Sequence, residues 1–362
     1  MEKALIAMSG GVDSSVSAAL MQKAGYECIG VTMKLHTESE AVCTEKSCCT
    51  AKDAEDARSV CTRLGMKYYV FNFTDDFERQ VIGRFISAYE NGFTPNPCID
   101  CNRYMKFDKL FRRAEELGCE FIVTGHYARV QYDPQSGRWL LKRSKNLAKD
   151  QTYVLYALTQ KQLAHTKFPL GEFSDKEQVR ALAAEMNLLN ADKRDSQDIC
   201  FVPDGDYAAF ICRHTGREYP RGSFIDTAGN VLGQHRGIIR YTIGQRKGLG
   251  LSFPQPMYVC AKDIARNTIT LAPESELYCS ALYAQDFNWI SLPEPPREPL
   301  RVTAMTRYHA TEAEALVCAD ESGRVRVAFD KPQRAVCAGQ AVVLYSGDTV
   351  VGGGTITAVE KA

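Results

Sequence analysis

Cysteines in polar surroundings are the residues of this sequence best suited to chemistry. Cys98 and Cys101 are spaced C-x-x-C in "TPNPCIDCNRYMKF", directly after two prolines, and Cys200 lies in the polar stretch "RDSQDICFVPDGDY". A thiolate is both a nucleophile and a soft metal ligand. We therefore expect these three side chains to take part in catalysis or in metal binding.

The spacing of the C-x-x-C pair alone allows three interpretations. A thioredoxin-like redox pair would open a helix in a different strand–helix context. Half of a zinc site would need a second close pair of ligands, which only Cys43, Cys48 and Cys49 offer. The third interpretation is a thiol pair that converges with Cys200 on sulfur chemistry, held rigidly by a proline-braced loop.

A glycine turn near the start of the chain has the composition of an anion site. It reads "AMSGGVDSSV", between the strand-like run "KALI" and the helix-like run "SAALMQKAG". It lacks the lysine of a Walker A loop and the third glycine of a dinucleotide fingerprint. Adjacent glycines, a helix N-terminus and serine hydroxyls would still bind phosphate, with Asp13 as a partner for Mg²⁺. The alternative, from the residues alone, is an ordinary glycine turn capped by serines.

Strand-like and helix-like segments alternate over residues 1–130 and would position these sites. The apolar runs "ALIAM", "ECIGVTM", "KYYVFNF" and "EFIVTG" alternate with helical patterns at residues 13–25, 51–65, 75–92 and 106–118. This alternation predicts an α/β fold, an open parallel sheet with helices on both faces. Ligands of such sheets bind at the carboxyl ends of the strands, where the glycine turn lies.

The remainder of the chain changes character twice. Residues 131–215 read as more helical, with Ser174 as the expected N-cap of one helix. From residue 222 onward, short alternating runs with turn signals indicate β-structure, and the proline-rich "SLPEPPREPL" reads as a linker or a strand-edge loop. We predict three parts: an α/β domain at 1–215, a small β-rich middle domain at 216–282 and a C-terminal β barrel at 283–362.

Composition narrows the class of protein. The 362 residues include 44 basic and 44 acidic side chains, 45% hydrophobic residues and 14 cysteines. No apolar run is long enough for a membrane span and the N-terminus does not resemble a signal peptide, so a cytoplasmic protein is expected. In a reducing compartment the cysteines form no disulfide framework. Those in apolar or alternating stretches are expected to pack within the fold: Cys28, Cys61, Cys119, Cys212 and Cys260.

Two stretches are rich in basic residues and contain no acid. Residues 137–149 carry Arg138, Lys142, Arg143, Lys145 and Lys149. Residues 235–247 carry Arg236, Arg240, Arg246 and Lys247, with Tyr241 among them. Such stretches would follow RNA phosphates in a chain of zero net charge, and a solvated basic surface is the alternative.

Seven motifs, in this order, resemble one known family. They are "SGGVDS", "CCTAKDAEDARSV", "TPNPC..CN..MKF", "FIVTGHYAR", "KDQTYVLYAL", "RDSQDICFV" and "RYTIGQRKGLG", and the match extends to the final "GGGTI". Over essentially its whole length the chain is similar to tRNA-specific 2-thiouridylases of the PP-loop ATP pyrophosphatase superfamily. The resemblance implies that ATP is cut between its α and β phosphates, that the C2 oxygen of the wobble uridine (position 34) of tRNA is adenylated, and that sulfur replaces this oxygen. It also implies a cysteine desulfurase or a sulfur-relay protein as the persulfide donor.

The resemblance further implies roles for individual residues. Cys101 would be the catalytic cysteine, and Cys200 would carry the persulfide. The residues expected to hold the ATP phosphates are Ala7, Met8, Ser9, Gly10, Gly11, Val12, Asp13 and Ser14, and those expected to line the adenosine pocket are Met33 and Gly125. The residues expected to touch the target base are Asn96, Pro97 and Cys98, and those expected to contact tRNA elsewhere are His126, Lys149, Asp150, Gln151, Arg307, Tyr308 and Gln340.

The sequence departs from the common family pattern at one position. Many members carry Asp three residues before the catalytic cysteine, where this chain has Cys98. Cys98, Cys101 and Cys200 would together suit a [4Fe–4S] cluster with one open iron, and the plain persulfide mechanism is the alternative. Two other functions stay open at this point: a PP-loop ligase that adenylates a small molecule, and a non-catalytic iron–sulfur or zinc protein that binds tRNA.

Overall fold

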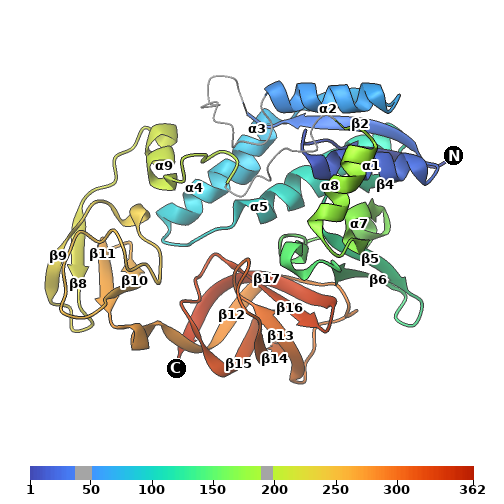
Figure 1. The fold of residues 1–362 in the computed structure, drawn as a ribbon. Coiled ribbons are helices and arrows are strands. Elements are labelled where there is room, and N and C mark those ends of the chain that lie inside the picture. Colours follow the sequence, from blue (N-terminus) through green and yellow to red (C-terminus); the bar gives the residue numbers. More distant parts are fainter. Residues whose placement is uncertain (37–50, 189–198) are drawn as a thin grey trace. The chain divides into compact units, whose positions relative to one another are not determined.

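The computed structural model describes residues 1–36, 51–188 and 199–362 and divides into two compact units (Figure 1). The first unit comprises Met1–Ile82, Pro97–Gly205 and Gly347–Val351. The second comprises Gly83–Asn96, Asp206–Ser346 and Gly352–Ala362. The predicted boundaries near residues 215 and 282 stay predictions. Within the described residues, no helix is both long and apolar enough to cross a bilayer.

The first unit is built on a parallel sheet of five strands in the order β3-β2-β1-β4-β7. The strands are β1 (Lys3–Ala7), β2 (Glu27–Lys34), β3 (Lys67–Asn72), β4 (Phe121–Val123) and β7 (Thr166–Lys167). The predicted open parallel sheet is therefore confirmed. From β1 the chain proceeds to β2 on one side, whereas β4 is added on the other side. This switch of direction beside β1 opens a crevice at the carboxyl ends of the strands.

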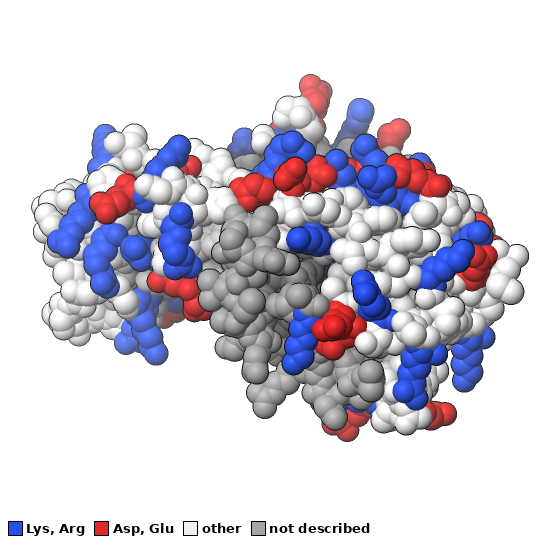
Figure 2. All heavy atoms as spheres, turned by 90° about the horizontal axis from the view of Figure 1, so that it is seen from above, with Lys and Arg blue, Asp and Glu red and all other residues white. Residues whose placement is uncertain are grey.

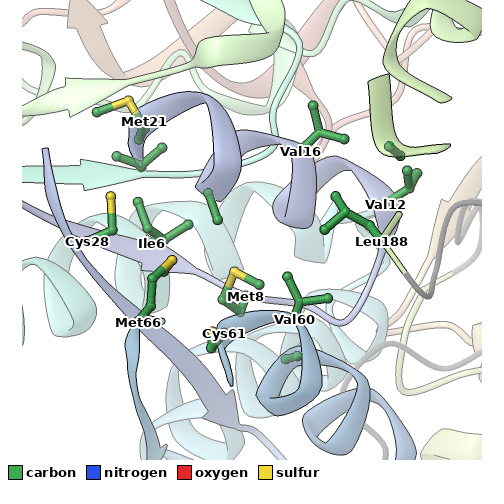
Figure 3. Close-up of a cluster of buried hydrophobic side chains, with 14 of the residues drawn as sticks. Ile6, Met8, Val12, Val16, Met21, Cys28, Val60, Cys61, Met66 and Leu188 are labelled. Carbon is green, nitrogen blue, oxygen red and sulfur yellow. The ribbon is translucent and has the colours of Figure 1, made fainter. Parts of the chain in front are cut away.

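Two helices pack on one face of this sheet. Figure 3 shows side chains of α1 (Val12–Lys23) and α2 (Ala51–Arg63) meeting β1, with Ile6, Met8, Val16 and Val60 among them. Ile6 and Val16 are fully buried. The continuous apolar run of β1 is typical of a parallel strand that is covered on both faces. This cluster fixes the first turn of α1 directly beyond the end of β1.

The segment that carries the C-x-x-C pair differs from its prediction. A loop was expected up to residue 105, but α5 (Pro97–Asp100), the π-helix η2 (Cys101–Lys109) and α6 (Leu110–Glu116) follow one another without a break. Pro97 opens the helix because its fixed φ suits the first helical position, where no N–H is needed. Cys98 and Cys101 therefore lie on helical backbone, and Cys101 is the first residue of the π-helical stretch.

The prediction that residues 131–215 are more helical than the preceding part is only partly right. A hairpin of β5 (Ala128–Asp133) and β6 (Arg138–Arg143) begins the region, and only short helices follow: η3 (Leu147–Lys149), η4 (Thr152–Val154), α7 (Gln160–Ala164) and η5 (Pro169–Glu172). The expected N-cap Ser174 is wrong by one residue. Asp175 caps α8 (Lys176–Glu185), because its carboxylate accepts a hydrogen bond from the backbone N–H of Gln178 at 2.8 Å.

The second unit is largely β-structure, as predicted. Its middle sheet has the order β10-β11-β8-β9, and its barrel is formed by β12 to β17, with β12 also pairing with β17. The strands are β8 (Gly222–Ile225), β9 (Val231–His235), β10 (Tyr258–Asp263), β11 (Thr268–Ala272), β12 (Tyr278–Trp289), β13 (Leu300–Met305), β14 (Ala313–Ala319), β15 (Val325–Arg334), β16 (Ala341–Ser346) and β17 (Thr349–Lys361). The helices α4 (Gly83–Glu90) and α9 (Tyr207–Thr215) belong to this unit.

Candidate functional site

The glycine turn after β1 is held in one conformation by its own hydrogen bonds. Gly10 has φ +72°, and a Cβ at this position would lie 2.8 Å from the Cα atom of Asp53, so only glycine fits. The hydroxyls of Ser14 and Ser15 both donate to the carbonyl oxygen of Gly11 at 3.0 Å. The serines therefore shape the loop, and α1 begins directly after it, where the N-terminus of a helix favours an anion.

A lysine that the sequence analysis missed lies against this turn. Lys176, the first residue of α8, places its Nζ atom 2.7 Å from both carboxylate oxygens of Asp13, and the Tyr127 hydroxyl donates to the Oδ1 atom at 2.9 Å. The Lys176 side chain is only 11% exposed. The turn has no lysine of its own, but the tertiary fold supplies one. In the sequence, Lys176 is marked by its position directly after a helix N-cap, and this position does not predict a role in binding or catalysis.

The end of β4 touches the same turn. A Cβ on Gly125 would lie 2.8 Å from the Asp13 carbonyl carbon and 2.9 Å from the Ser14 nitrogen, so a larger residue would push the turn away. The expected grouping of Gly125 with the glycine turn is thus present in the first unit. Met33 lies on β2, next to β1, and is 8% exposed. Its role in binding adenosine stays a prediction.

His126 follows Gly125 and is buried, with 8% of its surface exposed. Its Nε2 atom lies 3.3 Å from Lys106 Nζ and its Nδ1 atom 2.7 Å from Thr124 Oγ1. Burial, and after it the charge of Lys106, lowers the pKa of His126 well below 6.5. Both ring nitrogens are therefore used inside the fold, and a direct contact of His126 with tRNA stays a prediction.

The three cysteines singled out from the sequence all lie in the first unit. Cys98 is exposed, whereas Cys101 and Cys200 are partly buried. Next to Cys101, the side-chain amide of Asn102 donates to the carbonyl oxygen of Val154 at 3.0 Å and so fastens the start of η2. Val154 belongs to the "KDQTYVLYAL" motif, so this hydrogen bond connects the motif to the start of η2.

A metal site at these cysteines is not supported by their arrangement. Over residues 1–36, 51–188 and 199–362, no three His, Cys, Asp or Glu side chains are grouped so as to hold a metal ion. Cys98, Cys101 and Cys200 belong to these ranges, so they do not fit a [4Fe–4S] cluster in this conformation. The alternative zinc ligands Cys43, Cys48 and Cys49 lie outside the described residues.

The predicted tRNA contacts of the first unit differ in their availability. Asp150 is 8% exposed, and its carboxylate accepts hydrogen bonds from the Ser144 N–H at 2.9 Å and from the Thr152 hydroxyl at 2.5 Å. Gln151 accepts a bond from the Tyr127 N–H at 2.9 Å. Both side chains shape the chain around β5 and β6. Lys149 ends η3 and is partly buried.

The predicted tRNA contacts of the second unit lie near the barrel. Gln340 donates to the carbonyl oxygen of Thr94 at 2.8 Å, which fastens the strand-like segment that leads to Asn96. Arg307 is exposed beyond β13, and the ring of Tyr308 contacts that of His309 with centroids 3.9 Å apart. No structural observation tests whether these residues contact RNA.

The two basic stretches have different surroundings. In the first, Lys142 pairs with Asp348 at 3.2 Å and Lys145 with Glu172 at 2.6 Å. In the second, the basic residues Arg236, Arg240, Arg246 and Lys247 are exposed and make no ion pair with any described residue. Tyr241 is buried against Phe224 and His235, so it is not available to stack on a base. The face drawn in Figure 2 carries basic and acidic side chains side by side, in line with the zero net charge.

Family models match nearly the whole chain in three consecutive segments. Residues 2–204 match a model described as a tRNA methyl transferase HUP domain, residues 208–273 a tRNA methyl transferase PRC-barrel domain, and residues 279–356 an aminomethyltransferase β-barrel domain. The class of protein is therefore a HUP-type α/β domain followed by two β domains, in agreement with the sheet and the barrel described above.

Curated relatives identify the family. The chain is 52% identical to tRNA-specific 2-thiouridylase MnmA of Acetivibrio thermocellus, over 98% of this chain and 99% of that protein. It is 51% identical to the enzyme of the same name from Moorella thermoacetica, over 99% of this chain and 100% of that protein. The chain belongs to the tRNA-specific 2-thiouridylase family.

Proposed function

We propose that this protein uses ATP to replace the C2 oxygen of the wobble uridine of tRNA with sulfur. The observation that carries the proposal is the placing of the glycine turn, a lysine and two partly buried cysteines within one α/β unit. Family membership supports the same reaction, since the relatives bear the name of 2-thiouridylases.

Activation of uridine is assigned to the turn after β1. The C2 oxygen is a poor leaving group until it attacks the α-phosphate of ATP and expels pyrophosphate. The N–H groups of the first turn of α1 and the ammonium of Lys176 supply the positive field for the departing pyrophosphate. Because Lys176 also contacts Asp13, ATP competes with this carboxylate for the lysine. The carboxylate so released is of the donor type that Mg²⁺ prefers, and Mg²⁺ would neutralise phosphate charge there.

Sulfur delivery is assigned to Cys101 and Cys200. A donor protein, a cysteine desulfurase or a sulfur relay, leaves a persulfide on Cys200. The Cys101 thiolate attacks the inner sulfur of this persulfide, so that a Cys101–Cys200 disulfide forms and hydrosulfide leaves. Hydrosulfide adds to C2, the C2–O bond breaks, and AMP departs with the oxygen; a thiol then reduces the disulfide for the next turnover. In the shorter variant of this scheme the terminal sulfur of the Cys200 persulfide attacks C2 and AMP leaves; the Cys101 thiolate then attacks the Cys200 sulfur, which breaks the S–S bond and gives 2-thiouridine and the same disulfide.

Binding of tRNA is assigned to exposed basic residues rather than to global charge. The exposed second stretch, with Arg236, Arg240, Arg246 and Lys247, has no carboxylate partner within the described residues. An anticodon loop is single-stranded, so its uridine can leave the stack and enter a pocket.

The two half-reactions are separable by one substitution. We expect Cys200→Ser to release pyrophosphate from ATP in the presence of tRNA at a first-turnover rate near that of the wild type, which a coupled pyrophosphate assay follows, but to form neither AMP nor 2-thiouridine. Nucleoside mass spectrometry of the tRNA and chromatography of the nucleotides measure both products. Cys212→Ser, at a partly buried cysteine on α9, is the matched control and should keep both activities.

The outcome that contradicts the proposal is also defined. Full 2-thiouridine formation by Cys200→Ser would remove the persulfide role of this cysteine. If the wild type released no pyrophosphate with tRNA but did so with a small metabolite, the function would be that of a small-molecule ligase. Methylated tRNA as the product would favour the methyl transfer named in the family descriptions.

A further inference from the structure

The cations along η2 and α6 differ in how their charges are compensated. Lys109 Nζ lies 3.0 Å from a carboxylate oxygen of Asp76, and Arg112 lies 2.9 Å from Asp108. Lys106, on the same helix, forms no ion pair with a carboxylate of any described residue, although its side chain is half-buried. A half-buried ammonium has lost part of its hydration, so it is costly unless it binds something. Among the described residues, no carboxylate supplies the anion that would compensate this charge.

The partner of Lys106 orients its charge without cancelling it. Nζ of Lys106 lies 3.3 Å from His126 Nε2. An ammonium has no lone pair, so Nε2 must accept, and the Nδ1–H group therefore donates to the Thr124 hydroxyl at 2.7 Å. The rings of Phe107 and Phe168 flank the imidazole, with centroids 6.3 and 6.0 Å away. This burial keeps the imidazole neutral, since it lowers the pKa of His126 well below 6.5.

The pair of Lys106 and His126 connects the glycine turn after β1 with the helical segment that carries Cys101. His126 directly follows Gly125, and a Cβ on Gly125 would lie 2.9 Å from the Ser14 nitrogen in the first turn of α1. Lys106 also lies five residues after Cys101 in η2, and the i→i+5 bonding of a π-helix places such residues on adjacent turns. The ammonium is thus fastened beside the phosphate turn, on the helix that begins with the catalytic cysteine.

We propose that Lys106 binds the α-phosphate while it is attached to the uridine C2 oxygen, and that His126 positions it. The proposal rests on the function proposed above. When sulfur adds to C2, the electron pair of the C2–O bond leaves with the oxygen of AMP. The ammonium stabilises the charge that develops on this phosphate, and its proton is not transferred. A carboxylate in place of His126 would neutralise the ammonium, which explains why the partner is a buried imidazole.

Three variants test the proposal in the full-length protein with ATP, tRNA and sodium sulfide as the sulfur source. Lys106→Met removes the charge and keeps the length, Lys106→Arg keeps the charge, and Lys109→Met is the control on the same helix. We expect Lys106→Met to lower kcat for AMP formation about 100-fold with little change in KM for ATP. It should also weaken binding of AMP, measured by calorimetry, about tenfold or more. Lys106→Arg should recover part of both, and Lys109→Met should match the wild type.

The result that overturns the proposal is a Lys106→Met variant whose kcat and AMP affinity both stay near the wild-type values. A merely structural lysine would lower the unfolding midpoint without a selective loss of kcat, and denaturation by urea measures this for each variant. If the wild type forms no AMP with ATP, tRNA and sulfide, the proposed function fails and AMP binding alone decides the anion site. Equal affinity of the wild type and Lys106→Met, or absence of binding to both, then refutes it.

Discussion

At the scale of single residues, the candidate site depends on the ammonium group of Lys176, which lies far from the glycine turn in the sequence. Asp13 and Lys176 are 163 residues apart in sequence and in contact in the fold. Hydrogen bonds to charged groups contribute about 1.5–3 kcal/mol, so the group to which Lys176 binds has a measurable effect on the free energy of ligand binding. With ATP absent that partner is Asp13, and in the proposed mechanism it becomes the pyrophosphate.

Removing this lysine should therefore weaken ATP binding more than it weakens the fold. We expect Lys176→Met to raise the Kd for ATP about 10- to 100-fold, since one charge-assisted interaction is lost. Lys161→Met is the control, because Lys161 pairs with Glu115 at 2.7 Å on an exposed surface. Calorimetric titration with ATP measures the effect, and an unchanged Kd in Lys176→Met would show that the lysine serves only to hold Asp13.

At the scale of elements, the site is a contact between the end of one strand and the start of one helix. β1 and β4 are adjacent and parallel, so the loops that follow them emerge at the same edge of the sheet. The missing side chain at Gly125 is what allows the loop after β4 to touch the first turn of α1. The geometry of the phosphate site is therefore a property of two elements.

A single methyl group at this contact should displace the phosphate turn. We expect Gly125→Ala to reduce ATP binding about tenfold or more, because its Cβ would lie 2.8 Å from the Asp13 carbonyl carbon. In Gly118→Ala the new Cβ meets no atom within 4 Å, although φ there is +67°, so it controls for backbone strain alone. That variant should lose stability of about 1 kcal/mol but bind ATP normally. Normal ATP binding by Gly125→Ala would contradict a tight contact.

At the scale of the whole molecule, zero net charge means that attraction of RNA must be local. The 44 basic residues are balanced by 44 acidic ones, and many are consumed in ion pairs such as Arg129 with Asp348 at 2.8 Å. The exposed Arg240 and Arg246 of the second unit are among the basic residues that make no ion pair with any described residue. Release of counterions from RNA phosphates makes such contacts visible as salt dependence.

The double variant Arg240→Gln/Arg246→Gln should show this dependence. For two phosphate contacts we expect the slope of log Kd against log salt for tRNA to fall by about 1.5. The control Arg301→Gln removes a cation that pairs with Asp330 at 2.7 Å on the barrel and should leave the slope unchanged. Fluorescence titrations over a range of salt concentrations give both slopes, and identical slopes would place the tRNA elsewhere on the protein.

The sequence by itself determined the parallel sheet, the later β domains and the glycine turn after the first strand. These follow from local rules, because strand–helix alternation and paired glycines before a helix act over short distances. Predictions from local sequence patterns were less accurate where contacts with neighbouring elements decide the backbone conformation. Residues 97–105 were expected as a loop, yet Pro97 starts a helix there, and the anchor from Asn102 to Val154 spans 52 residues. The same holds for β5 and β6, whose pairing overrides the helical pattern.

Only the tertiary structure decided which charges meet. It placed Lys176 on Asp13, surrounded Asp150 with hydrogen-bond donors, and left Lys106 with a neutral histidine as its partner. Spacing along the chain contains no information on such contacts, because they depend on the order of strands and on which helix crosses which strand end. Electrostatic energy depends on distance and burial in space, and both are properties of the folded chain.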